Sequence, residues 1–185
     1  MLRHDYFFLF FLFIGNDSTK ENIFTFIAEM DGEEFRALES RRTIAVDLGS
    51  KRYFVKYHRG TKTAEILKNL LQFRLPVVSA HNEWRALSRL DALNIKVPQI
   101  AAYGRRGLLP QTCESFIVTD DVGTQENLED LTRDWQSKPP AFARKLALIR
   151  EVAAISCRMH SSGICHRDYY ICHFLMDQSP EENQK

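Results

Sequence analysis

The sequence lacks a hydrophobic run long enough to cross a membrane. Residues 6–14 form a run of nine apolar residues, whereas a membrane-spanning helix needs about 20. The run follows a short polar start, as the apolar part of a signal peptide would, but residues 15–18 offer no small-x-small cleavage pattern. We therefore expect residues 6–14 to form a buried strand or an anchor at a membrane interface.

Closely paired cysteines, internal repeats and low-complexity tracts are also missing. The four cysteines lie at positions 113, 157, 165 and 172, and none forms a C-x-x-C pair. With 44% hydrophobic and 26% charged residues, the chain can build a core without disulfides, and wholesale disorder is excluded. We predict reduced thiols and a cytosolic setting.

The net charge of +1 indicates no particular partner, but the charges are segregated along the chain. Residues 41–74 contain nine Lys and Arg against Asp47 and Glu65, whereas residues 114–134 contain seven acids against Arg133. A basic first half suits phosphates or an anionic surface. Two solvated faces of opposite charge are the simpler alternative.

Periodicity predicts an α+β lobe followed by the beginning of a helical lobe. Strands at residues 43–48 and 52–58 flank Gly49-Ser50, which is typical of a hairpin. The other strands are expected at residues 34–38, 97–103 and 115–119, with an exposed turn at 105–112. Helices are expected at residues 22–28, 63–73, 81–93 and 141–160. A linker is expected near residues 120–125.

A loop rich in cysteine and histidine, GICHRDYYICHFLMD, follows the last helix, which we expect to be buried and to end at Gly163. A short strand is expected at residues 172–176. Zinc is one alternative, but the spacings are not those of zinc knuckles, and we favour Cys165 and Cys172 as core residues. Asp168 is costly to bury without a role, and it could accept the proton of a substrate hydroxyl.

The tripeptide His166-Arg167-Asp168 matches the protein-kinase catalytic loop, H-R-D-x-x-x-x-N. Before it come a lysine at the end of an alternating strand, Lys56, and a glutamate on a helix, Glu83. This order is that of the kinase fold. It predicts that Lys56 neutralises nucleotide phosphates, that Glu83 holds Lys56 in an ion pair, and that Asp168 faces the acceptor hydroxyl.

Residues 115–122 read as a strand that runs into a hinge between lobes. Backbone groups near Thr119, Asp120 and Asp121 are predicted to meet the edge of the adenine ring. These three residues therefore join the candidate nucleotide site.

Two positions depart from the general kinase pattern. No G-x-G-x-x-G is present, and the predicted turn between the first two strands, residues 39–42, holds Arg41 and Arg42 instead. We infer that their charge partly replaces glycine backbone contacts, with a solvent-facing pair as the alternative. The metal-binding Asn is His173 here, and imidazole suits Mg²⁺ less well than an oxygen ligand does.

Taken together, the chain resembles the lipopolysaccharide core heptose kinases, within the wider family that includes the Kdo kinases of Gram-negative bacteria. The likeness runs from about residue 11 to residue 176. Its most specific block is H-R-D-x-Y-I-C-H-F-L, the family's own form of the catalytic loop. The segments that carry it are residues 35–43, 53–60, 66–71, 75–78, 83–84, 102–104, 115–119 and 166–175.

The resemblance implies a protein-kinase-like fold. Residues 1–121 would form the nucleotide-binding N-lobe, and residues 122–176 would begin a helical C-lobe with the catalytic loop at 166–173. It implies that ATP and Mg²⁺ are used to phosphorylate a hydroxyl of the first heptose of the lipopolysaccharide inner core. The protein would be cytoplasmic and peripheral on the inner face of the inner membrane, without a nucleic-acid partner.

The family has a further metal-binding aspartate after the catalytic loop, in a D-L-H-R-like motif. Here only Asp177 follows, in the polar tail 177–185, so we expect a C-terminally truncated kinase with an exposed apolar face on the helix 141–160 and little activity. The alternative is a non-catalytic module that binds a nucleotide or a partner. An aminoglycoside phosphotransferase would share the general loop, but not its Y-I-C-H-F-L continuation.

Overall fold

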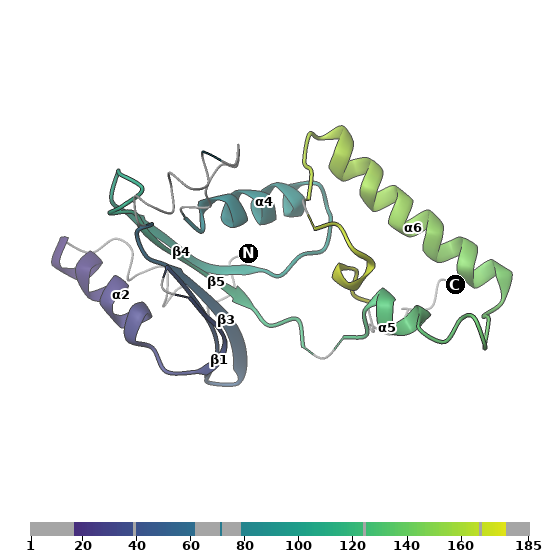
Figure 1. The fold of residues 1–185 in the computed structure, drawn as a ribbon, viewed down its shortest axis with the longest axis horizontal. Coiled ribbons are helices and arrows are strands. Elements are labelled where there is room, and N and C mark those ends of the chain that lie inside the picture. The colour runs from purple at the N-terminus through teal and green to yellow at the C-terminus, as the bar shows by residue number, and fades with distance from the viewer. Residues whose placement is uncertain are drawn as a thin grey trace. The chain divides into compact units, whose positions relative to one another are not determined.

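The computed structural model describes residues 17–38, 40–61, 71, 79–123, 125–166 and 168–176. The predicted helix at residues 63–73, apart from Leu71, and the apolar run 6–14 lie outside the described residues. The chain divides into two compact units, Met1–Asp121 and Val122–Lys185. Each unit is described by itself (Figure 1).

A five-stranded antiparallel sheet in the order β1-β2-β3-β5-β4 forms the first unit. Its strands are β1 (Glu33–Leu38), β2 (Arg41–Leu48), β3 (Lys51–His58), β4 (Ile100–Arg106) and β5 (Glu114–Asp120). The predicted hairpin is confirmed: Leu48 pairs with Lys51 across a two-residue turn, and Gly49 has a φ of 65°. Glycine adopts this left-handed backbone without a steric cost.

Two strand boundaries were wrong at the sequence level. β4 begins at Ile100 rather than at residue 97 and continues to Arg106, because Arg106 pairs with Glu114 and its Nε donates to that carboxylate at 2.6 Å. β2 begins at Arg41, so the two arginines predicted for the turn are the first residues of a strand. Arg41 pairs with Leu38 across the ladder.

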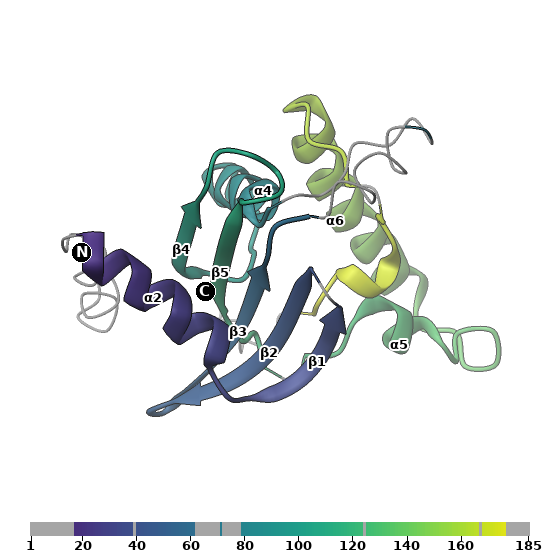
Figure 2. The same cartoon turned by 60° about the vertical axis from the view of Figure 1, so that its left-hand side comes forward.

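Helices cover both faces of this sheet. α2 (Asp17–Glu29) lies on one face and α4 (His81–Ala92) on the other (Figure 2). The main core lies under α2, where Phe24 meets the ring of Phe116 edge-on at 5.3 Å. Other buried members of this core are Ile27, Ile44, Val46, Tyr53, Val55, Tyr57, Ala102 and Val118.

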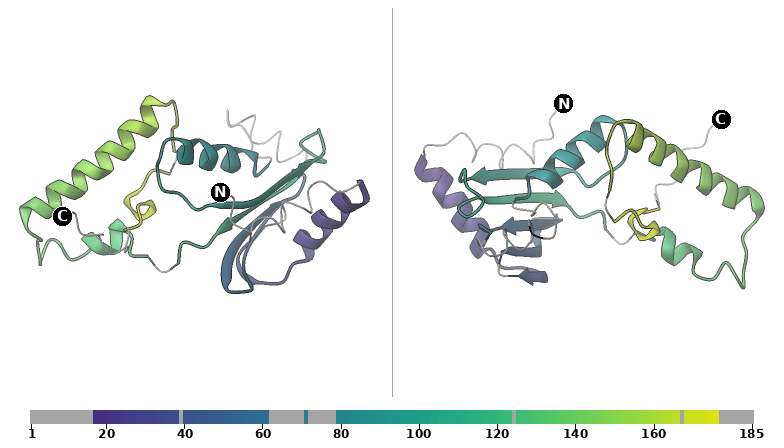
Figure 3. Two further views of the ribbon diagram at one scale, coloured as in Figure 1. Left: turned by 180° about the vertical axis from the view of Figure 1, so that it is seen from behind. Right: turned by 45° about the horizontal axis from the view of Figure 1, so that its top comes forward.

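The second unit contains α5 (Leu128–Thr132), the long helix α6 (Phe142–Ser161) and the 3-10 turn η1 (Ile171–His173) (Figure 3). α6 confirms the predicted helix, but its expected burial is wrong, since Met159 is its one buried residue. Phe142 and Ile149 are 77% and 64% exposed. The expected exposed apolar face is therefore present.

The strand predicted at residues 172–176 is also wrong. Ile171–His173 form the 3-10 turn, and extended pairing is limited to an isolated bridge between Leu175 and Asn127. The segment opposite Leu175 turns into α5 directly after Asn127, so a longer ladder cannot form. In the described part of the chain, no helix is long and apolar enough to span a membrane.

A substitution at Gly104 tests how tightly the main core is packed. A Cβ at this position would lie 2.5 Å from Cε1 of Phe116, which is fully buried. We expect Gly104→Ala to lower the free energy of unfolding by about 1–3 kcal/mol, as overpacking does, measured by urea denaturation. Gly49→Asn is the control, because nothing lies within 4 Å of its Cβ position and asparagine tolerates positive φ. Equal losses in both variants would contradict this account.

Candidate active site

Lys56 and Glu83 come together on the face of the sheet that carries α4. Along β3, Tyr53, Val55 and Tyr57 are buried in the core under α2, so the alternation of the strand directs Lys56 to the opposite face. Glu83 lies in the first turn of α4. The ammonium group of Lys56 forms an ion pair with the Glu83 carboxylate, and each side chain keeps about a third of its surface exposed (35% and 34%).

An aromatic cluster holds the first turn of α4 against β4. The ring of Trp84 stacks on Tyr103 at 4.9 Å and 18°, and Nδ1 of His81 lies 3.0 Å from the Tyr103 hydroxyl. The amide of Ala80 donates to Oγ of Ser115 at 2.9 Å. Burial raises the pKa of Tyr103. The orientation of Glu83 therefore depends on a cluster that sequence reasoning missed, although Trp84 and Tyr103 both lie in segments that carry the family resemblance.

His58 is a second residue that sequence reasoning missed. It is 5% exposed and lies two residues after Lys56, hence on the same face of β3. Burial, with smaller contributions from the charges of Arg41 and Lys56, lowers the pKa of His58 to about 4. The imidazole is therefore neutral at physiological pH. Its position two residues from a lysine, on an alternating strand, was the available signal.

Arg41 and Arg42 point to opposite faces. Arg42 reaches back to the end of α2, where its Nη1 donates to the carbonyl oxygens of Met30 at 2.9 Å and Ala28 at 3.2 Å. Its Nε also donates to Glu34 at 3.3 Å. The prediction that both arginines lie in the turn is therefore wrong, whereas their role in nucleotide binding stays a prediction. Arg42 holds helix and sheet together, whereas Arg41 is paired with His58.

Backbone amides at the predicted hinge are already engaged within the first unit. The Asp120 amide donates to the Gln99 carbonyl at 2.9 Å, and the Asp121 amide donates to the Arg52 carbonyl at 3.0 Å. Thr119 is buried in β5. The amides of Asp120 and Asp121 are thus used inside the sheet, and contact of other backbone groups near Thr119, Asp120 and Asp121 with the adenine ring stays a prediction.

An apolar pair lies beside Lys56 on the α4 face of the sheet. The rings of Phe35 and Phe54 meet edge-on at 5.2 Å, and Phe54 is two residues from Lys56 on β3. Phe35 is 56% exposed. This face thus offers an aromatic surface next to a cation.

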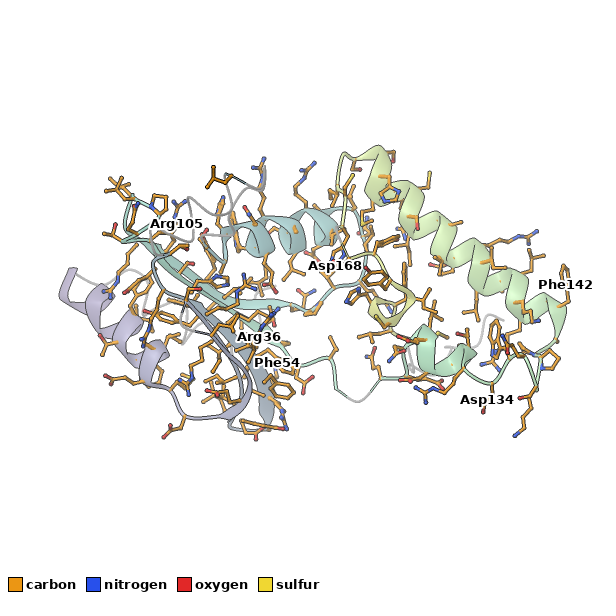
Figure 4. All side chains as sticks on the ribbon, in the orientation of Figure 1. Arg36, Phe54, Arg105, Asp134, Phe142 and Asp168 are labelled. Carbon is orange, nitrogen blue, oxygen red and sulfur yellow. The ribbon has the colours of Figure 1, made fainter. Side chains whose placement is uncertain are left out.

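Asp168 lies exposed on a loop that begins at the C-terminus of α6 (Figure 4). Gly163, with a φ of 70°, ends α6 as predicted: its amide donates to the His160 carbonyl, and the Ile164 amide donates to the Met159 carbonyl. This pair of bonds is the Schellman motif. The start of the loop is therefore fixed by backbone geometry.

The rest of the loop is held from two sides. The Tyr169 hydroxyl lies 2.8 Å from Oγ of Ser156 on α6, and the ring of Tyr169 meets Phe174 edge-on at 5.2 Å. Further on, the Leu128 amide donates to the Phe174 carbonyl and the Met176 amide to the Glu126 carbonyl, at 2.9 and 2.8 Å. Asp168 is thus a solvent-facing carboxylate on a well-anchored loop.

The thiols and imidazoles of the loop do not form a metal site. Cys165 is exposed and Cys172 is half-buried, so the interpretation of Cys165 as core is wrong. The His166 and His173 rings lie 5.3 Å apart, but among the described residues no three His, Cys, Asp or Glu side chains gather to hold an ion. Mg²⁺ prefers oxygen ligands, so the thiols and imidazoles of the loop do not suit it. The role of His173 as a metal ligand stays a prediction.

A protein-family model matches most of the chain. The model for the lipopolysaccharide kinase (Kdo/WaaP) family matches residues 27–185. The chain belongs to the Kdo/WaaP lipopolysaccharide kinase family. The resemblance drawn from the catalytic-loop block is confirmed.

Relatives of this Kdo/WaaP chain include two lipopolysaccharide core heptose(I) kinases named WaaP. The one from Escherichia coli (strain K12) is 44% identical over 156 residues, which cover 84% of this chain and 59% of the relative. The one from Pseudomonas aeruginosa (strain PAO1) is 42% identical over 153 residues, which cover 83% and 57%. The chain thus spans less than two thirds of the length of these relatives.

Among solved structures, WaaP in complex with acyl carrier protein matches with a TM-score of 0.69 and 35% identity. The match covers 83% of this chain and 56% of that one. The predicted fold class is confirmed: an antiparallel kinase-like N-lobe with part of a helical lobe.

The lowered pKa of His58 predicts how the free energy of unfolding depends on pH. Its pKa is lower in the folded chain (about 4) than in the unfolded one (6.5), so unfolding takes up a proton between these values. The contribution of the neutral His58 to the free energy of unfolding is complete above pH 6.5. It is lost as the pH falls to about 4, and the free energy of unfolding decreases by about 3 kcal/mol. We expect His58→Gln to flatten the urea-unfolding stability curve over this range. A stability curve for His58→Gln that runs parallel to the wild-type curve would contradict the assignment.

Proposed function

We propose that the protein takes part in ATP-dependent phosphorylation of a heptose hydroxyl in the lipopolysaccharide inner core. Family membership supports a kinase, and the relatives that are 42–44% identical carry the name of heptose(I) kinases. The observation that carries the proposal is the ion pair between Lys56 and Glu83, which joins a strand to a helix 27 positions later. This pairing is a requirement of catalysis in protein kinases.

The described side chains suit separate parts of phosphoryl transfer. Lys56 would neutralise charge on the nucleotide phosphates while Glu83 keeps its ammonium group in place. Asp168 would orient the acceptor hydroxyl and take its proton as the hydroxyl oxygen bonds to the γ-phosphorus and the bond to the leaving ADP breaks. Kinases use ATP with a divalent cation, for which we propose Mg²⁺.

The acceptor is a glycolipid, so we propose that the protein works at the cytoplasmic face of the inner membrane as a peripheral protein. The excess of Lys and Arg in residues 41–74 supports this location, because basic segments are attracted to anionic lipid surfaces.

We further propose that residues 1–185 by themselves bind nucleotide and transfer little phosphate. The nucleotide residues Lys56, Glu83 and Arg41 all lie in the unit Met1–Asp121, so binding does not require Asp168. The family's later metal-binding aspartate has no counterpart in residues 169–176, and phosphoryl transfer depends strongly on metal charge.

Binding and transfer can be separated with two variants. We expect Mg²⁺-ATP to raise the melting temperature of the chain, and Lys56→Met to weaken ATP binding roughly tenfold or more, since a charged contact is lost. Asp168→Asn should bind ATP normally. The measurements are calorimetric titration and transfer of labelled phosphate from ATP to heptose-containing lipopolysaccharide.

Lys51→Met is the matched control, because it changes a lysine of the same strand without touching the pair with Glu83. If Lys51→Met and Lys56→Met weaken ATP binding equally, the kinase arrangement is not in use. Phosphate transfer by residues 1–185 that Asp168→Asn abolishes would refute the proposal of weak transfer.

A further inference from the structure

Four polar side chains form a block on β2 and β3, on the face that carries α4. Arg41 pairs with His58, and Thr43 pairs with Lys56, in every second position of the antiparallel ladder, so both pairs lie on one face. Side chains opposite one another in such a ladder share a face, and their diagonal neighbours lie about 7–8 Å apart. Long side chains of the block can therefore reach one ligand together.

The charge of this block is suited to an anion. Arg41 and Lys56 both act on the buried imidazole of His58, which places two cations around one neutral hydrogen-bonding group. Among the described residues, Glu83 forms its ion pair with Lys56. Two neighbouring cations repel each other, and a bound anion would relieve that repulsion.

The turn between β1 and β2 lacks the glycines through which kinases usually bind phosphate. The turn between β1 and β2 contains no glycine, and the carbonyl of Ser40 in that turn accepts a bond from the Arg59 amide at 2.9 Å. Glycine-rich loops bind phosphates through backbone amides that approach the ligand closely. Because this turn has no glycine, we expect side chains to supply the contacts.

A hollow of about 130 Å³ near the same end of these strands is lined by Ala37, Leu38, Arg41, Arg42, Tyr57 and Arg59. It belongs to the α2 face, where Tyr57 and Arg42 point, and is therefore separate from the block around Lys56. Two of its arginines have structural contacts: Arg42 with the end of α2, and Arg59 over the ring of Tyr57 at 5.9 Å. Arg41 is the arginine whose charge acts on His58.

We infer that Arg41 and Lys56, with Thr43 and His58 between them, form the cradle for the nucleotide phosphates, and that Arg42 serves the fold instead. The inference rests on the proposed function, and it adds two binding residues to the site. It also separates two adjacent arginines that the sequence cannot tell apart. The cradle replaces a flexible glycine loop by cations fixed on a sheet.

The test compares Arg41→Gln with Arg42→Gln in the full chain. Dissociation constants for ATP, adenosine and inorganic tripolyphosphate are measured by calorimetry at one pH and one Mg²⁺ concentration. We expect Arg41→Gln to weaken binding of ATP and tripolyphosphate about ten- to a hundredfold, as loss of a charge-assisted bond does, and to leave adenosine unchanged. Arg42→Gln should lower the melting temperature and leave the ratio of ATP to adenosine affinity unchanged.

His58→Gln and Arg41→Lys refine the result. Arg41→Lys should recover most of the ATP affinity, because it keeps the charge, and His58→Gln should weaken tripolyphosphate binding by a smaller factor than Arg41→Gln does. Normal ATP binding in Arg41→Gln, or an equal loss in Arg42→Gln, would overturn the inference alone. A folded wild-type chain that binds adenosine but neither ATP nor tripolyphosphate would overturn the proposed function together with it.

Discussion

The two-residue alternation of β3 is the constraint on which the first unit depends. Tyr53, Val55 and Tyr57 enter the core under α2, and the same pleat turns Phe54, Lys56 and His58 toward the α4 face. A slip of one residue would bury a lysine in the core and expose tyrosines. Core and candidate site are therefore encoded by one pattern, and neither can shift without loss of the other.

The ion pair of Lys56 with Glu83 cannot hold α4 by itself. Both side chains are about a third exposed, and pairs of this kind contribute at most about 1 kcal/mol. α4 contains no buried residue, so its position comes from the stack of Trp84 on Tyr103 and from the bond of Ala80 to Ser115. The ion pair of Lys56 with Glu83 forms because α4 is held on the sheet by these contacts. Its effect is to orient the ammonium group of Lys56.

The sequence predicted those features that follow from local periodicity. The β2–β3 hairpin, α4 and the end of α6 at Gly163 all have strong local signals, such as a Gly-Ser turn between alternating strands. The roles of Arg42 and His58 depend on which neighbours the fold supplies. The local sequence around Arg42 does not indicate that carbonyl groups at the end of α2 will lie beside it. The strand expected at residues 172–176 failed for a related reason, because its apolar run has only Asn127 to pair with.

The two halves of the candidate chemistry are built on different physical principles. Lys56 is placed by a sheet whose core fixes it from behind, whereas Asp168 is exposed on a loop and owes its position to the hydrogen bonds at Gly163, Tyr169 and Phe174. Such a carboxylate can orient a hydroxyl and take its proton, provided that its backbone is held. That requirement explains why a short loop has anchors on both sides.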